Sequence, residues 1–237
     1  MPVIITEKKI KSKIKKGDRV AVIENIKYPH FECDEKKNRK LCGRMNAFYS
    51  SVAEKYSFHA RNKLPKRIKL NRLTYRLPMA VSMNYTIGLF DERIISVVID
   101  MIFSEGKNIK TRRFSQMWSL ENGNILPLDS FIQTDRKSKK KIFSLVLAIA
   151  KENGENPAFG YYADYLARLS KGFDIKNCFA VPNGICFFID AGCLSPVKYG
   201  VNGFVLTFDK LKDIIKDDFL PKDAENEPQN TDIVNNI

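Results

Sequence analysis

The sequence predicts an α+β fold: an antiparallel β-sheet with helices packed on one of its faces. Two patterns predict it. A long amphipathic helix is expected over residues 34–64, and pairs of apolar strands joined by turn residues follow it. The composition agrees, since 44% of the 237 residues are hydrophobic and 28% are charged. That length suits one large domain or two closely packed halves.

The first 76 residues are expected to form a basic arm (1–18) and a strand–helix unit (19–76). In the arm, Ile10 and Ile14 lie one helical turn apart among lysines. This spacing predicts either a short amphipathic element or, with better odds, a frayed terminus. The sequence RVAVIENIKY, residues 19–28, is typical of a strand.

The helix expected over 34–64 is the strongest single prediction. Asp34 is a suitable N-cap, and Pro65 ends the pattern. Its apolar side chains recur at spacings of three and four and form one stripe. The members of that stripe are Leu41, Met45, Phe48, Val52, Tyr56 and His59.

Residues 77–218 are expected to form a C-terminal α+β domain packed with the strand–helix unit. Three strands come first, over 79–90, 94–103 and 110–120, and Asn122-Gly123 is a strong turn signal. Helices are expected over 137–153, where Gly154 would be the C-cap, over 161–170 and over 209–218. The polar segment 219–237 is predicted to be disordered.

The segment NCFAVPNGICFFIDAGCLSPVKYG, residues 177–200, predicts a hairpin with three of the five cysteines. Pro182 and Asn183 would form the centre of its turn, with Gly184 in the left-handed position and Val181 opposite Ile185. The five cysteines are Cys33, Cys42, Cys178, Cys186 and Cys193. Their odd number and the absence of a CxxC pair predict reduced thiols and no metal site.

The net charge of +13 is concentrated at the N-terminal end of the chain. Residues 1–80 hold 21 lysines and arginines against seven acidic residues. This asymmetry favours an acidic partner, although a solvated, solubilising surface would explain it equally well. The first residues lack a signal-peptide pattern, and no apolar run is long enough for a membrane helix. These absences predict either an intracellular protein or a sequence trimmed of its export segment.

Sequence motifs for catalysis are absent, and we expect no enzyme activity and no cofactor. The chain contains no GxSxG, no phosphate-binding loop and no HExxH. The alternative is an enzyme of unrecognised type, in which Asp100, Glu105 and Asp190 would converge in space.

Basic and aromatic residues interleave in one segment, which we take as the candidate binding site. Its residues are Lys107, Lys110, Arg112, Arg113 and Trp118. This mixture suits sugars, anions or single-stranded nucleic acid, while an exposed strand with alternating faces is the alternative. Nucleic-acid binding through the arm and Arg112/Arg113 therefore stays open, although no RNP1-like or GXXG signature is present.

Several segments resemble a bacterial domain family of unknown function. KYPHFE and NAFYSSVAEKYSFHARNKL resemble its opening strand-and-helix unit. IISVVIDMIFSEG, SLENGNILPLDSFI and FAVPNGICFFIDAGCLSPVKYGVNGFVLTFDKLKDII resemble its second domain. That domain also occurs in RsiV-type anti-sigma factors and in the N-terminal region of the PdaC peptidoglycan deacetylase.

The resemblance implies an RsiV-like architecture and an extracytoplasmic sensing or binding module. RsiV-type proteins recognise lysozyme, but lysozyme is itself cationic and would be repelled by this basic chain. We therefore expect a non-catalytic module that recognises a protein or an anionic cell-envelope polymer. The compartment is open at this stage, because the N-terminal sequence predicts the cytoplasm and the resemblance an extracytoplasmic location.

Overall fold

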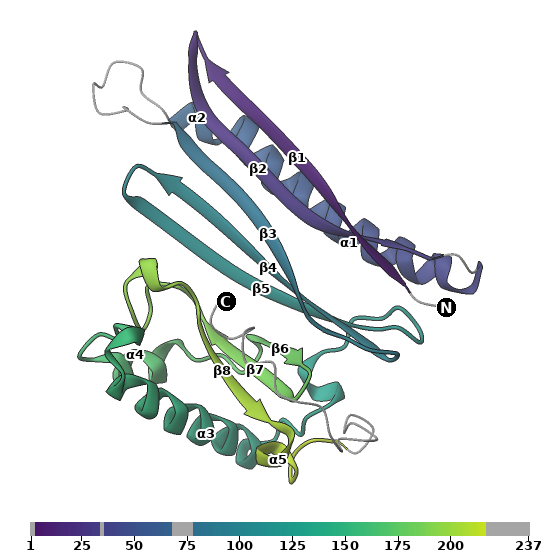
Figure 1. The fold of residues 1–237 in the computed structure, drawn as a ribbon, viewed down its shortest axis with the longest axis vertical. Coiled ribbons are helices and arrows are strands. Elements are labelled where there is room, and N and C mark those ends of the chain that lie inside the picture. Colours follow the sequence, from purple (N-terminus) through teal and green to yellow (C-terminus); the bar gives the residue numbers. More distant parts are fainter. Residues whose placement is uncertain (1–2, 34–35, 68–77, 217–237) are drawn as a thin grey trace. The chain divides into compact units, whose positions relative to one another are not determined.

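The computed structural model describes residues 3–33, 36–67 and 78–216. It contains a five-stranded sheet in the order β1-β2-β3-β4-β5 and a three-stranded sheet in the order β6-β7-β8 (Figure 1). A long helix lies against the larger sheet. The predicted α+β fold class is therefore confirmed.

Two compact units make up the chain. The first comprises Met1–Ile87, Val98–Phe114 and Ser119–Asn124, and the second comprises Gly88–Val97, Ser115–Trp118 and Ile125–Ile237. The three middle strands of the sequence therefore contribute residues to both units. Each unit has its own apolar core.

The larger sheet is mixed. Its strands are β1 (Ile4–Lys16), β2 (Arg19–Glu32), β3 (Met79–Phe90), β4 (Ile94–Glu105) and β5 (Asn108–Ser119). β1 and β2 pair antiparallel, whereas β2 and β3 pair parallel. The parallel pair arises because helices α1 (Lys36–Asn62) and α2 (Leu64–Arg67) separate these strands in the chain and return it to the same end of the sheet.

The N-terminal segment forms strand β1, so the expectation of a frayed terminus was wrong. Ile10, Ser12 and Ile14 are half-buried, and Lys9, Lys11 and Lys13 between them are exposed. This alternation has the period of two that a strand requires. The spacing of Ile10 and Ile14 fits one helical turn as well, and pairing with β2 decides between the two.

Helix α1 packs on the first unit through a stripe that differs in part from the predicted one. Leu41 and Met45 are buried as expected, but Tyr49, Ala53 and Ala60 are buried further along the helix. Phe48, Val52, Tyr56 and His59 are only half-buried. The apolar side chains mark the correct side, and small alanines allow close packing on a neighbouring line. The predicted N-cap Asp34 and the predicted disordered tail 219–237 lie outside the described residues.

Two contacts join α1 to the end of β2. The Asn46 side chain accepts a hydrogen bond from the Phe31 backbone N–H (2.8 Å) and donates one to the Phe31 carbonyl (2.9 Å). A disulfide links Cys33 to Cys42, whose Cα atoms are 6.4 Å apart. The prediction of reduced thiols is wrong for this pair, because folding brings together two cysteines whose sequence spacing matches no common motif.

The second unit packs helices α3 (Arg136–Glu155) and α4 (Tyr165–Gly172) with the small sheet. Its strands are β6 (Cys178–Val181), β7 (Gly184–Ile189) and β8 (Asn202–Thr207). Ile142 and Val146 of α3 share a core with Phe187 of β7 and Phe204 of β8. Asp135 caps α3 by accepting from the backbone N–H groups of Lys137 and Ser138.

Two predicted helix ends were wrong in this unit. Gly154 lies inside α3, not after it, and a side chain there would collide with the Tyr165 ring. The closing helix expected over 209–218 is a single short helix, α5 (Phe208–Leu211). None of the helices in the described part of the chain has the length and apolar character needed to cross a bilayer.

The cysteine-bearing hairpin is present, with a register one residue away from the prediction. Val181 pairs with Gly184 and Cys178 pairs with Phe187. Gly184 does not take the left-handed conformation. Instead, a Cβ on Gly184 would clash with the Leu206 carbonyl of β8, so the close approach of two strands requires glycine here.

The disulfide should stabilise the first unit. We expect the double substitution Cys33→Ser/Cys42→Ser to lower the free energy of unfolding by roughly 2–3 kcal/mol, because it releases a short closed loop in the unfolded chain. Urea denaturation followed by circular dichroism measures this. The control is Cys193→Ser, since Cys193 is a free thiol; an equal loss in the control would contradict the prediction.

Candidate binding surface

An edge strand carries the most concentrated charge of the first unit. β1 is the end strand of the five-stranded sheet, and six of its 13 residues are lysines. Lys9, Lys11 and Lys13 lie on one face, with Lys27 of β2 directly opposite Lys9. We call these four residues the lysine row. The row follows from strand geometry, because residues two apart in a strand point to the same face.

The lysine row is neutralised only in part. Glu7 forms an ion pair with Lys9 (2.7 Å) and a longer one with Lys27 (4.0 Å). The hydrogen bond from Lys9 is the main reason that the pKa of Glu7 lies below its ordinary value. Lys11 and Lys13 have no acidic side chain within ion-pair distance among the described residues. Two adjacent positions of the row are therefore available to an external anion.

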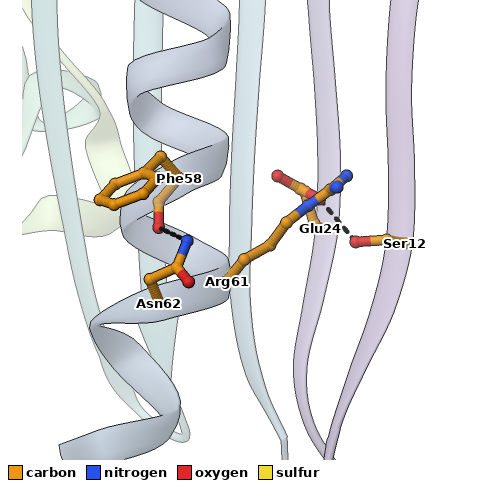
Figure 2. A network of polar contacts seen from close by, with 5 residues as sticks. All are labelled: Ser12, Glu24, Phe58, Arg61 and Asn62. Atoms are coloured by element: carbon orange, nitrogen blue, oxygen red, sulfur yellow. Dashed lines mark hydrogen bonds and ion pairs between the residues drawn. The ribbon is translucent and has the colours of Figure 1, made fainter.

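Glu24 fixes β1 to the helix side of the sheet. Its side chain is fully buried. Its Oε2 atom accepts hydrogen bonds from the Ser12 hydroxyl of β1 (2.5 Å) and from Arg61 Nε and Nη2 of α1 (3.1 and 3.0 Å). Figure 2 shows these three side chains meeting between the strands and the helix. One carboxylate thus connects β1, β2 and α1.

The two partners of the Glu24–Arg61 ion pair differ in their exposure to solvent. Its Oε1 atom is buried and has no hydrogen-bond partner in the described structure. Arg61, in contrast, is about half exposed, with 47% of its side chain accessible. The carboxylate therefore depends on the arginine more than the arginine depends on it, since only the carboxylate has lost its water.

The outward side of α1 presents a shallow depression in which Phe58 is 59% exposed. Phe58 also appears in Figure 2, where its carbonyl accepts a hydrogen bond from Asn62. The depression is lined by Ser51, Glu54, Lys55, Phe58, His59 and Lys63. Its mixed charge and open shape do not select a ligand, so it does not define a site.

The candidate binding residues predicted from sequence lie around the β4–β5 hairpin, and some of them are exposed while others are buried. Lys107, Lys110 and Arg112 are exposed. Arg113 is buried and makes a bidentate ion pair with Asp100, at 2.8 and 2.7 Å. Trp118 is only 4% exposed, so its ring faces the protein interior. The alternation of a strand explains part of this division, since Arg112 and Arg113 point to opposite faces.

Asp100 and Glu105, two of the three carboxylates that an enzyme would use in the alternative prediction, do not lie side by side on β4. Asp100 is engaged by Arg113, while Glu105 is exposed at the end of the strand. Five residues of strand separate their Cα atoms by roughly 17 Å and place them on opposite faces. Among the residues that the structure describes, no three His, Cys, Asp or Glu side chains gather as a metal site would require.

The hairpin cysteines lie in the packed interior of the second unit. Cys178 and Cys186 are each 2% exposed and unbonded to one another. Because Cys178 pairs with Phe187, Cys186 lies one position along and points to the other face. Burial raises the pKa of the Cys178 thiol to about 12, which leaves it unreactive near neutral pH.

Sequence reasoning missed the lysine row and the Glu24 network. A signal for the row exists, since KIKSKIK alternates strictly between lysine and smaller or apolar residues. No local signal identifies Glu24, because its partners come from a preceding strand and a following helix. Its burial is set entirely by tertiary structure.

The comparisons agree with this architecture. The chain is similar to a member of the DUF3298 family from Bacteroides fragilis, with a TM-score of 0.67 and 12% identity over 90% of this chain and 94% of that one. A DUF3298 family protein from Pseudomonas aeruginosa matches with a TM-score of 0.62 and 11% identity over 93% of this chain and 98% of that one. No protein-family model matches the chain, and neither does any curated protein.

These matches define the fold class: the chain has the fold of DUF3298 family proteins, a family of unknown function that includes RsiV- and PdaC-like domains. The resemblance predicted from sequence is confirmed at the level of the fold.

The contacts of Glu24 predict how substitution of Arg61 changes the stability of the protein. We expect Arg61→Ala to lower the free energy of unfolding by about 2 kcal/mol, because it leaves a buried carboxylate with Ser12 alone. Adding Glu24→Gln to that variant should restore most of the loss, since the buried charge is then gone. Urea denaturation of both variants tests this.

The matched control for Arg61 is Arg168→Ala. Arg168 also forms an ion pair, with Asp164, but both side chains are exposed. This substitution should cost less than Arg61→Ala. Equal effects of the two arginine substitutions, or no recovery in the double variant, would contradict the role assigned to Glu24.

The free thiols should differ in reactivity. At about pH 8, iodoacetamide should label Cys193 before Cys178 and Cys186, because only thiolates react and the two hairpin thiols are buried. Mass spectrometry of the digested protein measures the order, and labelling in urea supplies the reference rates. Labelling of Cys178 first in the folded protein would show that the hairpin is not the packed element described here.

Proposed function

We propose that the protein is a non-catalytic binding module that recognises an anionic partner, a protein or a cell-envelope polymer, through the lysine row. The observation that carries this proposal is a line of exposed lysines on an ordered strand, two of which, Lys11 and Lys13, form no ion pair with an acidic side chain among the described residues. Lysines aligned on an edge strand also prevent self-association of the sheet, and the proposal gives the same lysines a partner of opposite charge.

The β4–β5 hairpin is proposed as a second contributor. Lys107, Lys110 and Arg112 are exposed and add positive charge to the first unit. Arg113 and Trp118 act indirectly in this proposal. Arg113 is held by Asp100 inside the strand, and Trp118 is packed in the interior.

An extracytoplasmic location fits the proposed function better than a cytoplasmic one. The support is the Cys33–Cys42 disulfide, since such bonds persist in oxidising compartments and are rare in the cytosol. The proposed absence of enzyme activity is supported by Asp100, whose carboxylate is neutralised by Arg113 instead of facing a substrate.

The test is binding of polyphosphate and of poly-L-glutamate across a salt series. We expect the triple variant Lys9→Gln/Lys11→Gln/Lys13→Gln to bind at least about tenfold more weakly at low salt and to show a shallower salt dependence, because each lost lysine releases one counterion fewer. Fluorescence anisotropy of labelled probes measures both quantities.

The matched control removes three lysines elsewhere, with Lys139→Gln/Lys140→Gln/Lys151→Gln on α3, all of them exposed. It changes the net charge equally. Equal weakening by the control, or no binding of either probe by the wild type, would overturn the proposal. A labelled DNA duplex is included, and tighter binding of DNA than of either probe would assign the surface to nucleic acid instead.

A further inference from the structure

We propose that β1 is a docking edge, to which an acidic protein segment adds in extended conformation as a further strand of the sheet. The inference rests on the proposed function and specifies its partner as a peptide segment with acidic residues at alternate positions. It does not require any rearrangement of the described residues.

The first step is the open edge of β1. This strand stands at the end of the sheet order, and β2 is its only pairing partner in the part of the chain that the structure describes. Among the described residues, the backbone of residues 4–14 makes no hydrogen bond outside that pairing. The pairing is regular from Ile4 to Ile14, and its one irregularity falls between Ile14 and Lys15. Alternate backbone groups along these residues therefore point away from β2 and are available to a partner strand.

The second step is the spacing of charge. Lys9, Lys11 and Lys13 are two residues apart, so their Cα atoms are roughly 7 Å apart along the strand. An extended peptide with an acidic residue at every second position repeats at the same distance. A nucleic-acid strand carries a charge about every 3.4 Å, so every second phosphate would also meet a lysine of the row. The spacing therefore fits both classes of partner, and the open backbone edge favours a peptide, because a phosphate polymer has no N–H and C=O groups that could pair with β1.

The third step is the opposite face of β1. Ile10 and Ile14 are half-buried there, and Ile14 packs against the core of the first unit. Ile4 at the start of the strand is 49% exposed. A partner whose remaining positions are apolar would cover these side chains while its acidic residues meet the lysine row. The preferred segment therefore alternates acidic and apolar residues.

A second copy of the chain is a poor occupant. Pairing β1 with another β1 would bring two lysine rows together in a single sheet, and like charges on neighbouring strands repel. Lysines on an edge strand commonly prevent such self-association. The same lysines attract an acidic strand, so exclusion of like copies and selection of an unlike partner have one cause.

The docking strand is ordered before the partner arrives. Ser12 is bonded to Glu24, which Arg61 of α1 also contacts. A partner therefore orders only its own backbone on binding, which lowers the entropic cost of association.

The experiment uses the full chain and an 11-residue acetylated, amidated peptide of alternating glutamate and valine. The control peptide has the same sequence with N-methyl groups on two adjacent central residues, which removes one N–H donor from each edge, places a methyl group there and leaves the charge unchanged. We expect the control to bind at least about tenfold more weakly, since strand addition depends on backbone hydrogen bonds. Amide exchange at alternate residues of 4–14 should slow when the unmodified peptide is bound.

Any other result overturns the proposed strand addition, and comparing the two peptides with polyphosphate shows whether the proposed function fails with it. Equal binding of the two peptides would show a purely electrostatic surface and leave the proposed function intact. Binding of polyphosphate without binding of either peptide would assign the row to a polymer. Binding of no probe would overturn both proposals, and dimerisation through β1 in sedimentation would make a second copy the occupant.

Discussion

One buried carboxylate holds the most basic strand of the protein in place. β1 carries six lysines, whose mutual repulsion opposes a compact arrangement. Glu24 lies beneath this strand with a fully buried side chain and is bonded to Ser12 on one side and Arg61 on the other. Because its charge is buried, removing Arg61 would leave it uncompensated, whereas breaking a surface ion pair costs little. These contacts of Glu24 help to order β1, the strand that carries three residues of the lysine row.

The C-terminal end of β2 is attached to α1 by side-chain hydrogen bonds and a disulfide. Past the stretch where β3 pairs with β2, the Asn46 amide satisfies both backbone groups of Phe31. The Cys33–Cys42 disulfide then joins the end of β2 to α1 a few residues away. This stretch of β2 is thus occupied by a side chain of α1. The outer edge of β1, in contrast, has no such cover among the described residues.

The sequence predicted those elements whose information is local. The helix over residues 34–64, the hairpin after Asn177 and the paired strands of the middle were recognisable from period and turn residues. Contacts between residues far apart in the sequence were not predicted. The parallel pairing of β2 with β3, the disulfide and the burial of Glu24 all join residues through the tertiary fold. Gly184 shows the limit well, because its glycine is required by the approach of β8, some twenty residues later in the chain, and not by the turn beside it. Trp118, similarly, looks like a binding residue by type and is packed inside.

Chain order makes β1 an edge. β1 and β2 form a hairpin, so β1 occupies one side of β2 before α1 begins. α1 then returns the chain for a parallel strand, and β3 can pair with β2 only on its remaining side. β4 and β5 extend the sheet away from β1, so none of the later strands in residues 78–216 pairs with it. An uncovered edge of this length would be an aggregation hazard if it were apolar. Lysines at alternate positions remove that hazard without interrupting the regular pairing of residues 4–14, and the same lysines would attract the acidic strand proposed above.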